Sequence, residues 1–140
     1  LTINKFYKKQ FKKVPKFIIT GLNPHCESNL SPIEESTIIK PAISFLNKQK
    51  IKIFGPVAAD TVFMKDKIKK YDVVIGMYHD QVLAPMKALF EFKAINVTLG
   101  LPFIRVSPDH GPNTQMLGKN LSNETSLKEA FIFLKKISVN

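Results

Sequence analysis

The chain has 140 residues, of which 44% are hydrophobic and 23% charged, so it is long enough for one globular domain and is neither a disordered nor a disulfide-rich chain. Basic residues outnumber acidic ones by 21 to 11, and all but Arg105 are lysine, which favours a solvated surface over an arginine-based nucleic-acid interface. The single cysteine and the lack of an apolar run of about 20 residues favour a reducing, non-membrane location, and we expect the cytoplasm.

The first half of the chain predicts short strands that alternate with helices. Ser31 and Pro32, followed by acidic residues, are typical of a helix start, because a hydroxyl caps the first turn and proline tolerates it. The expected elements are, in order, a lysine-rich helix at the start, a strand over 16–20 that ends at Gly21, a helix from Ser31 to about Lys48 with a kink at Pro41, a strand over 52–54 closed by Gly55-Pro56, and a short helix near 61–64.

The second half continues this alternation. It predicts a buried strand over 72–77, a helix over 79–90, strands over 94–99 and 103–106, and an amphipathic helix over 126–137. The apolar stripe of that last helix comprises Leu127, Ala130, Phe131, Leu134 and Ile137. Strands that alternate with helices indicate an α/β fold, layered α/β/α, with a mostly parallel sheet.

All three histidines follow predicted strands. In open α/β sheets ligands bind at the carboxyl ends of the strands, so we expect His25 and His79 to approach each other at one end of the sheet. Two imidazoles could bind a divalent ion, but a catalytic zinc site typically has three protein ligands. The third ligand would come from His110, from Asp80 or from outside this chain. A purely structural role for each histidine is the alternative.

Three further residues are candidates for binding an anionic substrate. The planar guanidinium of Arg105 can grip a phosphate or carboxylate, with a buried structural ion pair as the alternative. Lys87 lies eight residues beyond His79 on the same predicted helix and could reach a ligand at the helix start, although it could equally be a surface lysine. Asn96 is a polar residue inside a strand and needs hydrogen-bond partners, which a substrate could supply.

Two other segments give weaker signals. Cys26 lies beside His25, but the acidic Glu27 and Glu35 would raise the pKa of its thiol, so we do not expect a nucleophile there. The segment 55–61 matches no Walker or Rossmann phosphate loop and, taken alone, is a plain turn.

Taken together, five collinear motifs resemble the 4-hydroxythreonine-4-phosphate dehydrogenase (PdxA) family. They are Gly21–His25, Gly55–Thr61, Met77–Gln81, Asn96–Pro102 with Arg105, and Asp109–Gly111. The resemblance runs from about Leu1 to Ile137 and covers only the C-terminal part of the family's chain. It implies a fold related to isocitrate and isopropylmalate dehydrogenases. It also implies an NAD-dependent oxidation and decarboxylation of 4-(phosphooxy)-L-threonine to 3-amino-2-oxopropyl phosphate in vitamin B6 biosynthesis.

The resemblance also implies partners and residue roles. Members of the family are homodimers with active sites at the interface, and they use a divalent metal (zinc, magnesium or cobalt). The metal is held by three histidines, of which two match His25 and His79 and the third belongs to an N-terminal segment. Substrate contacts match Lys87, Asn96 and Arg105, with Lys87 also a catalytic residue. The His110 loop resembles the cofactor-side loop of the related dehydrogenases, without individual cofactor contacts being placed.

This sequence departs from the family at two points. The loop after His25 is one residue shorter than usual, and Val82 replaces a common glycine. A paralogous dehydrogenase of four-carbon sugar-acid phosphates is the alternative enzyme, because it would keep the same metal and phosphate residues. A basic nucleic-acid-binding module around residues 5–16 is the alternative of another class. We expect the 140-residue chain by itself to be inactive as a dehydrogenase.

Overall fold

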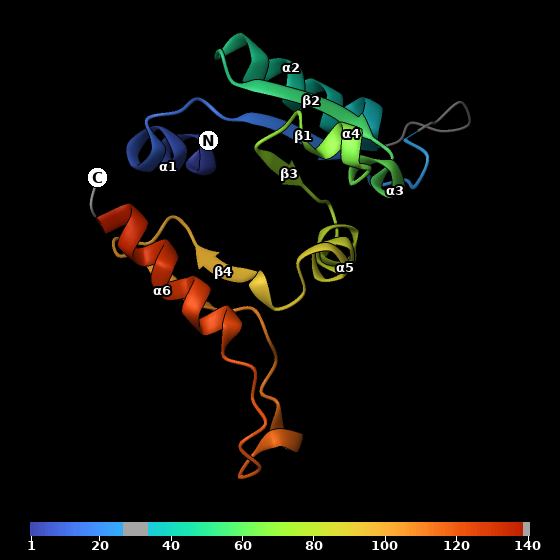
Figure 1. Ribbon diagram of the computed structural model, residues 1–140. Coiled ribbons are helices and arrows are strands. Elements are labelled where there is room, and N and C mark those ends of the chain that lie inside the picture. Colours follow the sequence, from blue (N-terminus) through green and yellow to red (C-terminus); the bar gives the residue numbers. More distant parts are fainter. Residues whose placement is uncertain (27–33, 139–140) are drawn as a thin grey trace. The chain divides into compact units, whose positions relative to one another are not determined.

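The computed structural model describes residues 1–26 and 34–138, which form two compact units (Figure 1). We call Lys12–Pro85 the parallel-sheet unit, and Leu1–Phe11 together with Met86–Asn140 the hairpin unit. Helix α5 (His79–Phe90) begins in the first and ends in the second. Among the described residues, none of the helices has the length and apolar character needed to span a lipid bilayer.

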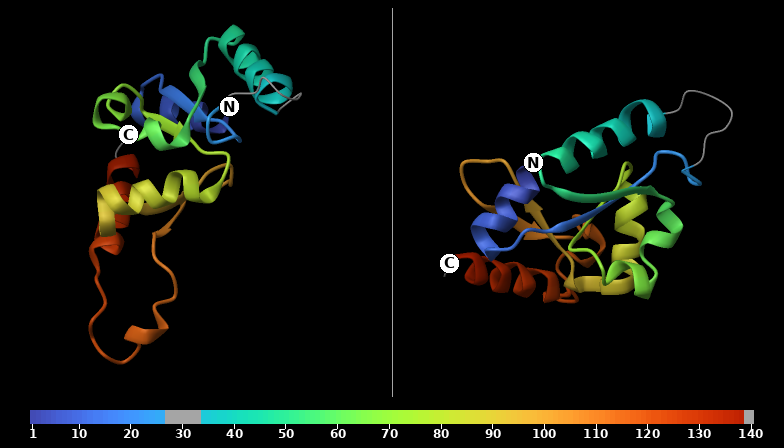
Figure 2. Two further views of the ribbon diagram at one scale, coloured as in Figure 1. Left: turned by 90° about the vertical axis from the view of Figure 1, so that its right-hand side faces the viewer. Right: turned by 90° about the horizontal axis from the view of Figure 1, so that it is seen from above.

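The parallel-sheet unit is built around strand β1 (Lys16–Thr20), which lies between β2 (Lys52–Val57) and β3 (Val73–Ile75). Both pairings are parallel, with Phe17 opposite Ile53 on one side and Val73 on the other. The connections contain η1 (Glu35–Ile39, a π-helix), α2 (Lys40–Lys48), α3 (Ala59–Val62) and α4 (Lys65–Ile68), and α2 runs along β2 (Figure 2). The core of this unit consists of Phe17, Ile18, Ile39, Ile43, Ile51, Ile53 and Val62.

Strand β2 is longer than the sequence predicts, because it continues through Gly55-Pro56 instead of ending there. The pairing of β1 with β2 is irregular between Ile18 and Thr20, and a strand irregularity is where proline is tolerated. Gly55 has φ +125°, and a Cβ at this position would lie 2.5 Å from the carbonyl oxygen of Ile19. Only glycine therefore allows β2 to stay paired at this point.

The hairpin unit contains an antiparallel pair of strands, β4 (Ile95–Thr98) and β5 (Arg105–Pro108). Helix α6 (Thr125–Ser138) packs on both strands, and α1 (Thr2–Phe11) stacks Phe6 on Phe133 with ring centroids 6.4 Å apart. Short 3₁₀ helices η2 (Glu91–Lys93) and η3 (Thr114–Met116) complete the unit. Ala94, Ala130 and Ile137 are its buried apolar residues.

The predicted fold class is confirmed: helices accompany a parallel sheet. The last two strands, however, pair with each other as a separate antiparallel ribbon. The helix predicted from Ser31 to Lys48 starts at residues that lie outside the described part. Its described part is the π-helix η1 up to Ile39, followed by α2, which has Pro41 in its first turn. The short helix expected near 61–64 is replaced by α3 and α4.

Three expectations about burial and strand boundaries were wrong. The strand predicted over 72–77 is limited to β3 and is only half-buried. β5 begins at Arg105 and not at Phe103, because Phe103 and Ile104 are exposed loop residues. In the stripe of α6, Ala130 and Ile137 are buried as expected, but Leu127 and Phe131 are 46% and 65% exposed. Helical spacing identifies an apolar face but not how much of that face is covered.

Candidate active site

His25 and His79 both follow the carboxyl edge of the parallel sheet. His25 lies five residues after the end of β1, and His79 begins α5 four residues after the end of β3. Because β1 and β3 are parallel neighbours, the two loops leave the sheet at the same edge. Both side chains are exposed. Their mutual approach stays a prediction.

Gln81 joins these two loops, although in the sequence it is recognisable only as the last residue of the motif Met77–Gln81. Its Oε1 accepts hydrogen bonds from Thr20 Oγ1 (2.7 Å) and from the backbone N–H of Met77 (2.8 Å). Its Nε2 donates to the carbonyl of Gly21 (2.9 Å). One side chain therefore links the end of β1 to the segment that leads from β3 into α5. The sequence feature that points to Gln81 is its position two residues after His79.

Close packing also defines the start of α5. A Cβ at Gly76 would lie 2.6 Å from Cγ1 of Val82, so the valine occupies the space that a larger residue at position 76 would need. Val82 is thus accommodated by a glycine on the preceding segment.

The imidazoles of His25 and His79, at the carboxyl edge of the parallel sheet, are of a type that binds divalent metals. His79 Nδ1 lies 2.9 Å from Asp80 Oδ1, an arrangement that leaves Nε2 for a ligand and is common for metal-binding histidines. The backbone N–H of His25 donates to Asn23 Oδ1 (2.9 Å), which fixes the turn that carries the imidazole. Within residues 1–26 and 34–138, no three His, Cys, Asp or Glu side chains are grouped to hold a metal.

Glu35 is hydrogen-bonded to the loop that carries His25. This carboxylate is 1% exposed, and the backbone N–H of Asn23 donates to its Oε1 (2.5 Å). That hydrogen bond lowers the pKa of Glu35 and outweighs the opposing effect of burial. The pKa of the neighbouring Cys26 thiol is raised, first by burial and further by the charge of Glu35. The prediction that Cys26 is not an activated nucleophile agrees with this direction; Glu27 lies outside the described residues.

We predict that Glu35→Gln makes the chain less sensitive to acid. The lowered pKa of Glu35 in the folded state means that its charge stabilises the fold fully above the ordinary glutamate pKa. This stabilisation is lost as the pH falls through the lower folded value. Melting temperatures from circular dichroism between pH 7 and pH 3 should fall less steeply for Glu35→Gln than for the unaltered chain. Glu34→Gln, which removes the same charge from the exposed neighbouring residue, should leave the slope unchanged; equal slopes for all three would contradict the account.

In the hairpin unit, Asn96 and Arg105 lie on the same face of the β4–β5 ribbon. Asn96 is opposite Ser107 and Thr98 is opposite Arg105, and side chains two residues apart on a strand share a face. Arg105 donates to Thr98 Oγ1 (3.0 Å) and is exposed. In the described part of the chain it makes no ion pair, so the alternative of a buried structural ion pair is not observed. Its guanidinium keeps donors for a ligand.

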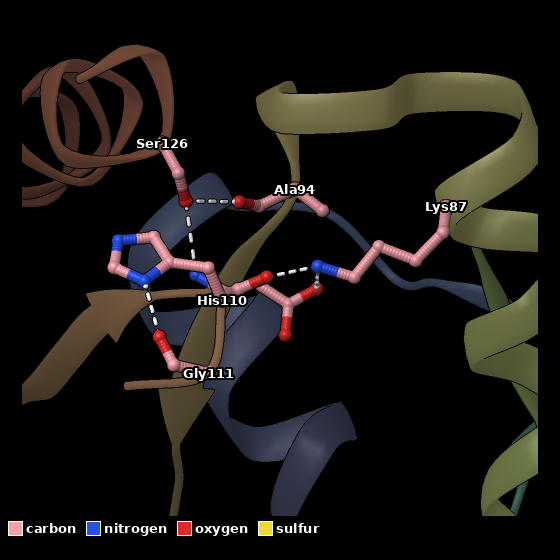
Figure 3. Close-up of polar contacts among 6 residues, drawn as sticks. Lys87, Ala94, His110, Gly111 and Ser126 are labelled. Carbon is pink, nitrogen blue, oxygen red and sulfur yellow. Dashed lines mark hydrogen bonds and ion pairs between the residues drawn. The ribbon is translucent and has the colours of Figure 1, made fainter. Parts of the chain in front are cut away.

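Lys87, in contrast, is paired. Its Nζ lies 3.0 Å from Asp109 Oδ2 and also donates to the carbonyl oxygen of Asp109, which follows β5 (Figure 3). The side chain of Lys87 is 44% exposed and that of Asp109 is 18% exposed. In the sequence, Asp109 is recognisable only as part of the motif Asp109–Gly111, which gives it no role of its own.

Among the hollows that the described residues of the hairpin unit form are the following two. One, of about 420 Å³, is lined by Phe6, Lys9 and Gln10 of α1 and by residues 98–104. The other, of about 360 Å³, is lined by residues of the loop between β5 and α6, including His110, whose Nδ1 lies 2.9 Å from the carbonyl oxygen of Gly111. Both are large enough for part of a small ligand.

Comparison with known sequences gives a consistent result. The family model of the pyridoxal phosphate biosynthetic protein PdxA matches residues 1–133. A 4-hydroxythreonine-4-phosphate dehydrogenase from Sulfurihydrogenibium sp. is 44% identical over 140 residues, covering 96% of this chain and 43% of the relative. One from Beijerinckia indica is 43% identical over 126 residues, covering 89% of this chain and 37% of the relative. The chain thus spans less than half the length of these curated relatives.

Solved structures agree. A 4-hydroxythreonine-4-phosphate dehydrogenase from Klebsiella pneumoniae has a TM-score of 0.80 at 32% identity, and one from Burkholderia phymatum has a TM-score of 0.74 at 34% identity. Each alignment covers 97% of this chain and 42% of the solved chain. The chain therefore belongs to the pyridoxal phosphate biosynthetic protein PdxA family.

Proposed function

We propose that this chain is the C-terminal part of an NAD- and metal-dependent 4-hydroxythreonine-4-phosphate dehydrogenase that acts in vitamin B6 biosynthesis. The enzyme would oxidise 4-(phosphooxy)-L-threonine and release CO₂ to give 3-amino-2-oxopropyl phosphate. The observation that carries the proposal is the exposed face of β4–β5, where the only arginine of the chain shares a face with Asn96 and has guanidinium donors available. A phosphorylated substrate needs this kind of group.

His25 and His79 are the proposed metal ligands of this chain. Imidazole nitrogen suits zinc and cobalt, and the Asp80 carboxylate at His79 Nδ1 would orient the ring. A divalent ion there would polarise the substrate oxygen that is oxidised. The third histidine ligand would come from the part of the enzyme outside this chain.

The hairpin unit would bind the substrate. Arg105 would take the phosphate through its planar fork, Asn96 would donate or accept through its amide, and Lys87 would donate to a substrate oxygen as a catalytic residue. NAD would accept the hydride. We place the cofactor side at the hollow around His110, on the strength of its loop position and size.

Two further proposals concern assembly and location. The hairpin unit exposes large apolar side chains, among them Phe103 (62%), Leu117 (86%), Leu121 (68%) and Phe131 (65%). Exposed apolar surface of this kind is typical of protein interfaces and supports a homodimer with the active site at the interface. Cys26 cannot form a disulfide within the chain, which supports a location in the reducing cytoplasm.

The proposal can be tested in a hybrid enzyme, namely the Sulfurihydrogenibium dehydrogenase with its matching segment replaced by this chain. We predict that Arg105→Lys raises the KM for 4-(phosphooxy)-L-threonine about tenfold, because lysine loses the bidentate grip. Tenfold corresponds to about 1.4 kcal/mol, which is close to the lower end of the range for hydrogen bonds to charged groups. Steady-state NADH production measures the change.

Lys93→Arg is the matched control, since it exchanges the same two residue types at an exposed position of the same unit. Its KM should equal that of the unaltered hybrid. If Arg105→Lys also leaves KM unchanged, Arg105 does not bind the phosphate.

A further inference from the structure

A buried hydroxyl fixes the segment that follows β5. Ser126, near the start of α6, is 1% exposed. Its Oγ donates to the carbonyl oxygen of Ala94 (2.6 Å) and accepts from the backbone N–H of Asp109 (2.9 Å), as Figure 3 shows for Ser126 and Ala94. One hydroxyl thus connects three parts of the unit: the residue before β4, the residue after β5 and the first turn of α6.

Asp109 in turn holds Lys87. Both its side-chain Oδ2, at 3.0 Å, and its carbonyl oxygen contact the Lys87 ammonium. An ammonium has three N–H donors; one donates to the carbonyl oxygen of Asp109, and the carboxylate of the same residue pairs with the positive charge, so N–H groups remain for a further acceptor. The long lysine side chain, which ordinarily samples many rotamers, is thereby restricted in direction.

We propose that Asp109, fixed by Ser126, is a positioning residue that holds the Lys87 ammonium with one N–H directed at an oxygen of the substrate. This inference rests on the proposed function, which makes Lys87 a substrate-binding residue. Ser126 is hydrogen-bonded to the residue before β4 and to the residue after β5, the two strands that carry Asn96 and Arg105. The same hydroxyl therefore sets the positions of all three proposed substrate-binding residues relative to one another.

The acylation rate of Lys87 in the 140-residue chain tests the pairing directly. A limiting amount of acetic anhydride followed by peptide mass spectrometry gives a separate rate for each lysine. Asp109→Asn should raise the rate of Lys87 about two- to fivefold, the range expected for a partly exposed ion pair. Ser126→Ala should raise it in the same direction, and Ser126→Thr, which keeps the hydroxyl, should restore the original rate.

Two comparisons separate positioning from unfolding. If Ser126→Ala unfolds the chain, the acylation rates of all lysines will rise together. Asp109→Asn, which changes a residue outside the core, then tests whether Asp109 holds Lys87. Glu124→Gln removes the carboxylate that lies 2.6 Å from Lys128 Nζ in the same unit, so it should raise the rate of Lys128 and not that of Lys87. An unchanged Lys87 rate in Asp109→Asn overturns the proposal, and an unchanged rate in Ser126→Ala removes Ser126 from it.

Substrate protection distinguishes this inference from the proposed function. In the unaltered hybrid enzyme, 4-(phosphooxy)-L-threonine should slow the acylation of Lys87 and leave that of Lys128 unchanged. If the substrate gives no protection while Asp109→Asn still raises the rate, the ion pair stands and the substrate-binding role of Lys87 is wrong. If protection is seen but Asp109→Asn changes nothing, Lys87 binds substrate without the help of Asp109.

Discussion

Alanine in place of either His25 or His79 should lower the zinc affinity of the hybrid enzyme by at least about a hundredfold. Loss of a residue that merely orients a ligand already costs about ten- to a hundredfold, and loss of a ligand itself should cost more. A site with three protein ligands would be left with two, which bind zinc poorly. Competition with a chromophoric chelator measures the affinity without depending on catalysis.

His110→Ala supplies the control, because it removes the remaining histidine of the chain. His110 is exposed, and its Nδ1 lies against the carbonyl oxygen of Gly111, so the zinc affinity should not change. An unchanged affinity in His25→Ala or His79→Ala would contradict the proposed ligand set. A loss in His110→Ala instead would move the metal to the loop between β5 and α6.

The purified 140-residue chain should give no NADH from 4-(phosphooxy)-L-threonine, even with added zinc, magnesium or cobalt. Two histidines leave the metal short of a protein ligand, and no third His, Cys, Asp or Glu joins a metal-binding group in the described residues. Water would also reach the reacting centre, which weakens the charged contacts on which oxidation depends.

The hybrid enzyme, assayed beside the chain, should turn over at about 1 per second, an ordinary rate for an enzyme. A similar rate from the chain alone would contradict the account. It would mean that His110 or Asp80 completes the metal site, or that the reaction needs fewer ligands than proposed.

Local sequence signals predicted the elements whose boundaries depend on neighbouring residues. Strand β1 and helix α5 have the predicted bounds, because Gly21 ends the first and the spacing of apolar residues marks the second. Strand β2 passes Gly55-Pro56 because it stays paired with β1, and Gly55 leaves room for the carbonyl oxygen of Ile19. Strand β1 lies far away in the sequence, so no local pattern carries that information.

In the candidate site, too, some residues can be recognised from the local sequence and others only from contacts with distant parts of the chain. Lys87, Asn96 and Arg105 stand out by residue type and position, and the register of β4 and β5 places two of them on one face. Their supporting residues could not be found in this way. Glu35 reaches Asn23 across 12 residues and Gln81 reaches Gly21 across 60, and each is an ordinary polar residue until the chain is folded.

Under the proposed function, this chain supplies the phosphate-binding part of a 4-hydroxythreonine-4-phosphate dehydrogenase. The most direct test is NADH production by the hybrid enzyme from three substrates: 4-(phosphooxy)-L-threonine, its unphosphorylated form, and a four-carbon sugar-acid phosphate. We predict the highest kcat/KM for 4-(phosphooxy)-L-threonine and a lower kcat/KM for its unphosphorylated form. In the Arg105→Lys variant, this difference between the two substrates should largely disappear. A preference for the sugar-acid phosphate would identify the paralogous dehydrogenase instead, and equal rates with and without the phosphate would contradict the claim.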